Sequence, residues 1–214
     1  MKNIMLIFDL DGTLWDSSQP VADSWNEVFE RRGAQLKKLT AADIQAVMGK
    51  TMEEIARTIL PVYDEAGREL FKECETYEVE YIGVHGGTLY EGVRETLKAL
   101  QDAGYKLAIV SNCQSGYIDA FLKSMNMREY FCDTEEWGNT LKPKADNIRL
   151  VMERNNFSKA IYVGDTQKDM DSARGAGIPF IHAAYGFGKT DGPDGSINKI
   201  EDLPEEVLKI EKQL

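Results

Sequence analysis

The chain has 214 residues, of which 43% are hydrophobic, so it can bury a core large enough for one or two domains. Its 36 acidic and 25 basic residues give a formal net charge of -11. Affinity for nucleic acids and anionic membranes comes largely from Lys and Arg, so this charge argues against both as partners. It remains compatible with a small phosphorylated metabolite, which needs only a few local cations.

The cysteines and the apolar runs indicate the compartment. Cys74, Cys113 and Cys132 are widely spaced, odd in number and form no CxxC pair, which free thiols in a reducing compartment explain most simply. The apolar run near the N-terminus is too short for a signal peptide, and no run approaches the roughly 20 apolar residues that span a membrane. We therefore expect a cytoplasmic protein; whether it is a monomer or a homodimer is left open.

The first thirteen residues contain the strongest local signal. Residues 4–8 (IMLIF) form a short apolar run that stops at Asp9, Asp11 and the turn residue Gly12. An apolar run of this length before a turn is typical of a buried strand in a parallel sheet. Carboxylates at the carboxyl end of such a strand lie where open α/β sheets bind their ligands.

A helical region follows this strand. Apolar residues between about 17 and 82 recur at helical spacing, with no strand among them. We interpret this region as about four amphipathic helices that form a separate cap, because so many helices cannot serve as one crossover between strands. The alternative is an ordinary helical layer of a single domain. The predicted division assigns 1–15 and 84–214 to the core and 16–83 to the cap.

Strand and helix signals alternate after the glycines near 83–87. Such alternation predicts an α/β fold with a Rossmann-like, doubly wound parallel sheet. The predicted strands are 107–110, 130–132, 161–163 and 179–182, and the predicted helices are 91–103, 118–125, 144–154, one through Met170 and Ala173, and 203–214.

Polar residues follow three of the predicted strands directly. Asp9 and Asp11 follow the first strand, Ser111 and Asn112 end the second, and Asp165 follows the third. Because the carboxyl ends of parallel strands share one edge of the sheet, we expect these side chains to meet in one crevice.

The acidic members of this set predict a magnesium site. Asp9, Asp11 and Asp165, with Asp169 one turn into the next helix, offer the hard oxygen ligands that Mg²⁺ binds beside water and substrate phosphate. Asp169 could instead be a surface charge of its helix. Lys142, just before a predicted helix, can add a fixed cation.

Charge decides what such a site can do. A carboxylate that attacks a phosphate dianion meets a repulsion of roughly 4 kcal/mol per charge pair, at about 4 Å and an effective dielectric constant of about 20. A divalent ion and one lysine can remove this barrier. Asp11, two residues from Asp9, could then protonate the leaving oxygen and later activate water.

Four motifs in order, DLDGT, hydrophobic-Ser-Asn, Lys-Pro and GDTQKD, resemble those of the haloacid dehalogenase (HAD) superfamily of phosphatases. The chain looks most like the phosphoglycolate-phosphatase-like branch, which has an α-helical cap after the first motif. The resemblance implies a Mg²⁺-dependent phosphatase that forms an aspartyl-phosphate, with phosphoglycolate as the first candidate substrate. The implied roles are nucleophile for Asp9; general acid and base for Asp11; phosphate binding for Thr13, Ser111, Asn112 and Lys142; and metal binding for Asp9, Asp165, the backbone carbonyl of Asp11 and, through ordered water, Asp169.

The sequence departs from the family pattern in ways that leave alternatives open. Lys144-Ala145 follows the Lys-Pro pair where the family often has a second proline, so Lys144 competes with Lys142 for the phosphate-binding role. Dehalogenases of the superfamily lack a counterpart of Asp11, so its presence favours phosphoryl chemistry over carbon–halogen cleavage. A sugar phosphomutase and a non-catalytic phosphate-binding module are the alternative functions.

Two further stretches bear on the site. Residues 183–190 (AAYGFGKT) nearly spell a P-loop, but the residues after them cannot open a helix, so we expect a loop beside the active site. Lys50, in a predicted cap loop, could contact the distal group of a substrate, although a surface lysine fits the pattern equally well.

Overall fold

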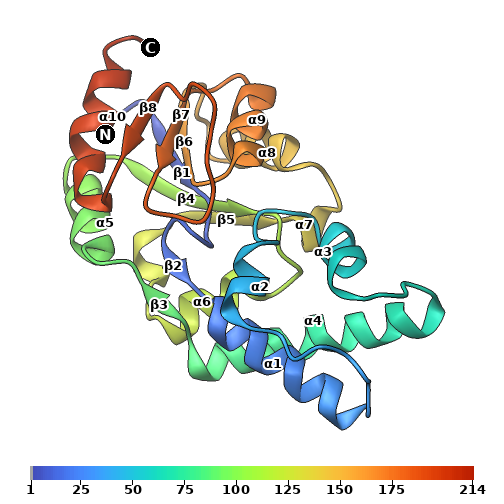
Figure 1. The fold of residues 1–214 in the computed structure, drawn as a ribbon. Helices are drawn as coiled ribbons and strands as arrows, with labels where there is room; N and C mark the ends of the chain where they lie inside the picture. The colour runs from blue at the N-terminus through green and yellow to red at the C-terminus, as the bar shows by residue number, and fades with distance from the viewer. Residues whose placement is uncertain (1) are drawn as a thin grey trace.

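A computed structural model describes residues 2–214 of the protein. Its centre is a six-stranded parallel sheet in the order β5-β4-β1-β6-β7-β8 (Figure 1). This architecture confirms the predicted Rossmann-like α/β sheet. The strands are β1 (Met5–Phe8), β4 (Lys106–Ser111), β5 (Asp133–Glu136), β6 (Ala160–Gly164), β7 (Phe180–Ala183) and β8 (Gly195–Ile197).

The first strand lies in the middle of this sheet, between β4 and β6. All four of its side chains are fully buried, two on each face, which explains why its sequence is apolar without alternation. Phe8, its last residue, pairs with Ile109 of β4 and Val163 of β6. This register brings the residues that end or follow the three strands to one edge of the sheet.

Helices cover both faces of the sheet. One apolar cluster joins the sheet to α8 (Lys144–Arg154) and α9 (Gln167–Ala176). The other joins it to α5 (Val93–Asp102), α6 (Tyr117–Ser124) and α10 (Leu203–Glu211). Short elements complete the core: α7 (Trp137–Thr140) and the 3₁₀ helices η1 (Arg128–Tyr130) and η2 (Ile200–Asp202).

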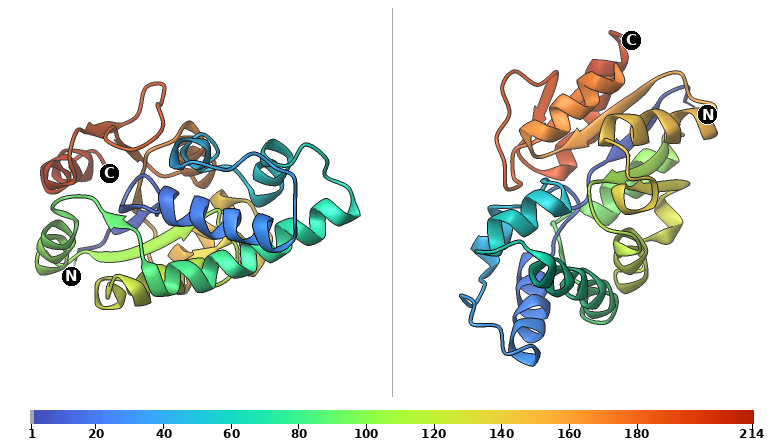
Figure 2. Two further views of the ribbon diagram at one scale, coloured as in Figure 1. Left: turned by 60° about the horizontal axis from the view of Figure 1, so that its bottom comes forward. Right: turned by 90° about the vertical axis from the view of Figure 1, so that its right-hand side faces the viewer.

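Four helices between residues 18 and 85 form a group that we call the helical insert. They are α1 (Ser18–Arg31), α2 (Ala41–Gln45), α3 (Met52–Ile59) and α4 (Glu65–His85). Figure 1 and the right-hand view of Figure 2 show them gathered beside one end of the sheet, rather than on its faces. An antiparallel pair, β2 (Trp15–Asp16) and β3 (Thr88–Leu89), flanks the insert at its two connections to the core. The division into a core and a cap with the predicted boundaries remains our interpretation.

One predicted strand was wrong. Residues 130–132 are not a strand: η1 ends at Tyr130, and the edge strand begins only at Asp133. The sequence of β5 is Asp-Thr-Glu-Glu, so it lacks the apolar pattern of a buried strand. Arg154 of α8 compensates this charge, because its guanidinium pairs with both Asp133 and Glu135.

Two further findings concern membrane-spanning helices and the state of the cysteines. No helix within residues 2–214 has both the length and the apolar character needed to cross a bilayer. The three cysteines are free thiols, of which Cys74 and Cys113 are buried and Cys132 is exposed.

Candidate active site

A buried lysine between two aspartates forms the centre of the site. Asp9 follows β1, and its Oδ1 atom lies 2.9 Å from Nζ of Lys144. The same Nζ lies 2.6 Å from Oδ1 of Asp169. The three side chains are at most 4% exposed, so these ion pairs form away from bulk water. A buried pair of this kind holds its members firmly in one geometry, because breaking it leaves an uncompensated buried charge.

The prediction that Lys142 fills this role is corrected to Lys144. Lys142 is exposed, and the hydrogen bond from its backbone N–H goes to Oγ1 of Thr140. Lys144 is the first residue of α8 and lies on the same helix face as the buried Ile148 and Val151. The helix phase thus turns Lys144 inward, while Lys142 precedes the helix.

Electrostatics in this centre follow from burial and close packing. Burial and the neighbouring Asp169 carboxylate, opposed by Lys144, together raise the pKa of Asp9 to about 7. Burial lowers the pKa of Lys144, but the two carboxylates outweigh it and hold that pKa well above its usual range. The ammonium group is therefore a permanent positive charge beside Asp9.

Asp165, directly after β6, completes an acidic cluster. One ligand oxygen from each of Asp9, Asp165 and Asp169 can be chosen so that all three lie within 4.8 Å of one another. Oδ2 of Asp165 accepts hydrogen bonds from the backbone N–H groups of Phe187 (2.7 Å) and Gly188 (3.2 Å). Its Oδ1 is buried and has no hydrogen-bond partner among residues 2–214. Burial, Asp169 and then Asp9 raise the pKa of Asp165 to about 8.

This cluster fits a divalent cation. Three carboxylates so close together repel one another unless a cation compensates them, and an unpaired buried carboxylate oxygen is a natural ligand. Both oxygens of Asp169 are already engaged, Oδ1 by Lys144 and Oδ2 by the backbone N–H and hydroxyl of Thr166. Asp9 and Asp165 are therefore the carboxylates best placed to hold an ion directly, and Asp169 holds Lys144.

Asp11 points to a different set of partners. Its Oδ1 atom accepts hydrogen bonds from the hydroxyls of Ser17 (2.6 Å) and Tyr117 (2.9 Å). Burial raises the pKa of Asp11 to about 6, although these two hydrogen bonds oppose the rise. A positioned carboxyl group with a pKa close to neutrality suits general acid and base chemistry.

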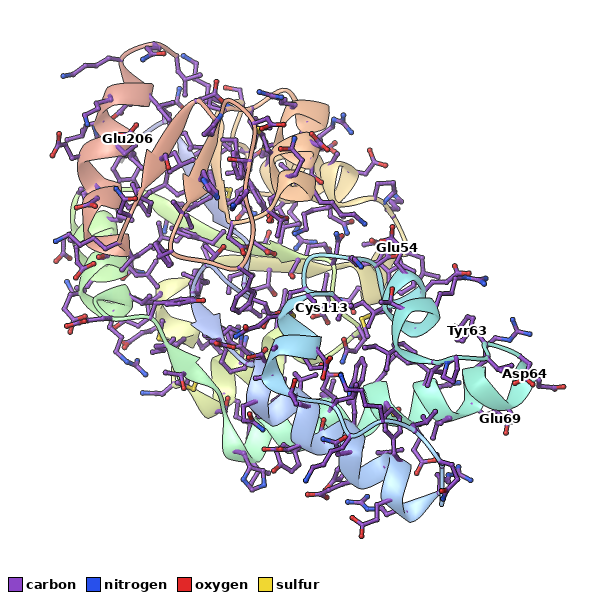
Figure 3. The ribbon with its side chains drawn as sticks, in the orientation of Figure 1. Glu54, Tyr63, Asp64, Glu69, Cys113 and Glu206 are labelled. Atoms are coloured by element: carbon purple, nitrogen blue, oxygen red, sulfur yellow. The ribbon has the colours of Figure 1, made fainter. Side chains whose placement is uncertain are left out.

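A pocket lies between the strand ends and the helical insert. Asp9, Asp11, Ser111 and Asn112 line its core side, so the structure brings these predicted residues together. Thr13 is buried but does not belong to the lining, and its hydroxyl has no partner among residues 2–214. Figure 3 labels Cys113, another lining residue, in the region between the sheet and the insert.

Gln114 and Tyr117 of the core also line the pocket, and the insert contributes the remaining residues. Its residues are mainly apolar, with one cation and one carboxyl group among them: Val21, Trp25, Ile44, Val47, Met48, Gly49, Lys50, Met52, Ile55 and Glu78.

Residues 6–183 match the family model of haloacid dehalogenase-like hydrolases. The chain belongs to this family. A phosphoglycolate phosphatase of Rhodobacter capsulatus is 30% identical over 197 residues, an alignment that covers 86% of each chain. A phosphoglycolate phosphatase of Vibrio vulnificus (strain YJ016) is 28% identical over 193 residues, covering 86% of this chain and 84% of the relative.

Solved structures share the fold of this HAD-like hydrolase. The crystal structure of a predicted phosphoglycolate phosphatase from Haemophilus somnus 129PT matches it with a TM-score of 0.82 and 23% identity, over 99% of both chains. The family assignment confirms the predicted HAD-type enzyme, and the relatives' names agree with the prediction of a phosphoric monoester hydrolase.

The loop after β7 fixes one of the acidic residues in the site of this HAD-like hydrolase. As expected, the P-loop-like stretch is a loop beside the active site, and its backbone N–H groups bind the carboxylate of Asp165 rather than a phosphate. The backbone of Gly12 also packs closely against Asp165, because a Cβ atom at this position would clash with the Asp165 carboxylate. Its φ of +79° likewise favours glycine.

Sequence reasoning missed two residues that hold Asp11. Ser17 occupies the N-cap position of α1, but its hydroxyl binds Asp11 instead of capping the helix. Tyr117 begins α6, about a hundred residues from Asp11 in the chain. A serine before a helix reads as a cap, and a tyrosine in an amphipathic helix reads as core, so neither carried a distinct signal.

Proposed function

We propose that the protein is a Mg²⁺-dependent phosphatase that hydrolyses a small phosphomonoester through an aspartyl-phosphate on Asp9. The observation that carries this proposal is the buried Asp9 carboxylate, which is fixed by Lys144 and clusters with Asp165, a residue that has an unpaired buried oxygen. Phosphoglycolate is the first substrate to test, because the curated relatives are named for it.

The chain's own residues would hold the metal. Asp9 and Asp165, with the backbone carbonyl of Asp11, would bind Mg²⁺, while Asp169 keeps Lys144 in place. A bound Mg²⁺ would neutralise charge on the substrate phosphate. Lys144 adds a second, permanent positive charge beside the nucleophile.

In the first half-reaction, a carboxylate oxygen of Asp9 forms a bond to phosphorus while the bond from phosphorus to the ester oxygen breaks. Asp11 gives its proton to the departing oxygen, so the leaving group departs as an alcohol. Its pKa of about 6 leaves a larger fraction of Asp11 protonated near neutral pH than an ordinary aspartate would have. Ser111 and Asn112 line the pocket together with Asp9, which supports the proposal that they bind the phosphoryl oxygens.

In the second half-reaction, Asp11 acts as a base. Its carboxylate takes a proton from water as the water oxygen attacks phosphorus, and the bond to Asp9 breaks. Phosphate leaves, Asp9 is a carboxylate again, and Asp11 is protonated for the next cycle. Ser17 and Tyr117 hold the Asp11 carboxyl group in one orientation through both steps.

The helical insert covers the site in this state. Nδ2 of Asn112 donates a weak hydrogen bond of 3.4 Å to the backbone carbonyl of Gly49, and Lys168 of α9 pairs with Glu54 of α3. Both contacts join the core to the insert. A covered site excludes bulk water from the reacting groups, which favours transfer to Asp9 first. We also propose a cytoplasmic location, which the three free thiols support.

The test is phosphate release from a panel of phosphorylated metabolites, measured with Mg²⁺ and with EDTA, for the wild type and Asp9→Asn. We expect turnover that EDTA abolishes and that falls by on the order of 10⁴-fold in Asp9→Asn, because an amide cannot act as the nucleophile. Activity of Asp9→Asn above about one hundredth of wild type would contradict the mechanism. No release from any substrate would contradict the proposed function and direct attention to the phosphomutase reaction.

A further inference from the structure

Glu78 is a buried carboxyl group in the part of the pocket that the helical insert provides. It lies in α4, is 4% exposed and lines the pocket that also contains Asp9 and Asp11. Its Oε2 atom accepts a hydrogen bond of 2.6 Å from the indole nitrogen of Trp25, which is itself buried. The catalytic steps described above make no use of this pair.

Glu78 differs from Asp9 and Asp169 of the core because it has no cation partner. No Lys, Arg or His nitrogen within residues 2–214 comes within 4.0 Å of its carboxyl oxygens. Burying an ionised carboxylate is costly when the neighbouring donors, the Trp25 indole and the Gln114 amide, are all neutral, so the neutral acid is the favoured form. Burial raises the pKa of Glu78 to about 8; Trp25 and Gln114 oppose the rise, whereas Asp11 and Glu75 add to it.

A neutral Glu78 has a free donor. One carboxyl oxygen accepts the hydrogen bond from Trp25, so the O–H group of the other oxygen can donate to a ligand. Apolar side chains of α1 to α3 surround this part of the pocket, and Lys50 is the one Lys or Arg in the described lining. This end of the pocket therefore offers one acidic hydrogen and one positive charge among apolar groups.

We infer that Glu78, as a carboxylic acid positioned by Trp25, determines specificity by donating a hydrogen bond to a carboxylate on the leaving group of the substrate. Hydrogen bonds to a charged acceptor are shorter and stronger than neutral ones, so a carboxylate gains more from this donor than a hydroxyl does. Lys50 supplies the compensating charge. The inference rests on the proposed phosphatase function and names its substrate class: small phosphomonoesters whose alcohol portion carries a carboxylate.

The test measures the turnover of two substrates by three forms of the enzyme, the wild type, Glu78→Gln and Glu78→Met. Phosphoglycolate and ethyl phosphate differ in that a carboxylate replaces a methyl group. Glu78→Gln keeps an acceptor for Trp25 and a donor for the ligand, whereas Glu78→Met has similar length and neither group. p-Nitrophenyl phosphate serves as a general phosphatase substrate, and thermal unfolding checks that each variant is folded.

We expect the wild type to prefer phosphoglycolate over ethyl phosphate in kcat/KM. Glu78→Met should lower kcat/KM for phosphoglycolate on the order of 10-fold, mainly through KM, and leave ethyl phosphate within about twofold of wild type. Glu78→Gln should retain most of the preference for phosphoglycolate.

Three results would overturn this inference and leave the proposed function standing. They are an equal loss on both substrates in Glu78→Met, a loss in Glu78→Gln as large as in Glu78→Met, and wild-type turnover of p-nitrophenyl phosphate without preference for phosphoglycolate. Absence of phosphate release from all three substrates would instead contradict the proposed function, so the two failures are distinguishable.

Discussion

The two sides of the pocket handle charge in opposite ways. On the core side, Lys144 bridges Asp9 and Asp169, and backbone N–H groups hold Asp165. On the side of the helical insert, the lining is mostly apolar, and Glu78 has an indole as its donor. We propose that the core side stabilises a highly charged reaction centre and that the insert side discriminates between leaving groups by shape and a few hydrogen bonds.

This difference predicts distinct kinetic signatures. Substitutions on the core side should lower kcat, since they remove interactions that strengthen in the transition state. Substitutions on the insert side should change KM and substrate preference. The experiments below test this contrast and are ordered by their expected effect on turnover.

The largest effect is expected from removing the lysine of the core. Lys144→Met should lower kcat about 10²- to 10³-fold, because it removes the positive charge beside the nucleophile. The matched control is Lys142→Met, which removes an exposed lysine two residues away and should stay within about twofold of wild type. Steady-state phosphate release measures both. The reverse order of effects would restore Lys142 as the phosphate-binding lysine.

A smaller loss is expected from the residues that hold Asp11. Tyr117→Phe should lower kcat by about 10-fold, because Asp11 loses one of the two hydroxyls that fix its orientation. The hydrogen bond lowers the pKa of Asp11, so its removal should raise that pKa and shift to higher pH the limb of the pH–rate profile that Asp11 governs. A profile of kcat against pH between 5 and 9 measures both effects. An unchanged profile with lower kcat would show that Tyr117 acts through packing alone.

Glu78→Gln should change stability more than turnover. The pKa of Glu78 is about 8 in the folded protein, against an ordinary value of 4.5, so its contribution to stability is fully present below pH 4.5. As the pH rises to about 8 this contribution is lost, and the free energy of unfolding falls by at most about 5 kcal/mol. Glutamine does not ionise, so the Tm of Glu78→Gln relative to wild type should rise across this pH range. A constant Tm difference would indicate that Glu78 is already ionised in the folded protein.

The smallest effect is expected at the contact between Lys168 and Glu54. Both side chains are about half exposed, and exposed ion pairs contribute little to stability. Lys168→Met should therefore change Tm by less than about 2 °C and kcat/KM by less than about twofold. Thermal unfolding and phosphate release check this. A large change in kcat would indicate that this ion pair controls closure of the insert over the site.

The sequence predicted the core side well, because strand ends have a local signature. β1, β4 and β6 are buried on both faces, so each is an apolar run, and the polar residue at or after its end marks the site. The lysine was misassigned because one proline motif was given more weight than the helix phase. The spacing of Lys144 to Ile148 and Val151 would have shown which lysine turns inward.

The insert side was less predictable for a physical reason. Glu78 lies among charged residues of a long amphipathic helix, where a glutamate reads as solvated, and Trp25 lies 53 residues before it. Their hydrogen bond depends on how α1 packs against α4, which no local pattern encodes. The acidic strand β5 was missed for a related reason, since Arg154, which neutralises it, belongs to a later helix.

The central position of β1 has a consequence for synthesis. The strand leaves the ribosome before the other strands of the sheet, yet its neighbours are residues 106–111 and 160–164, whereas all four helices of the insert are complete by residue 85. One edge of this apolar strand thus stays unpaired until residue 111 has been translated and the other until residue 164, and unpaired apolar strands promote aggregation. The strand that leads to Asp9, the proposed nucleophile, is therefore a part of the nascent chain that needs protection until β6 has been made.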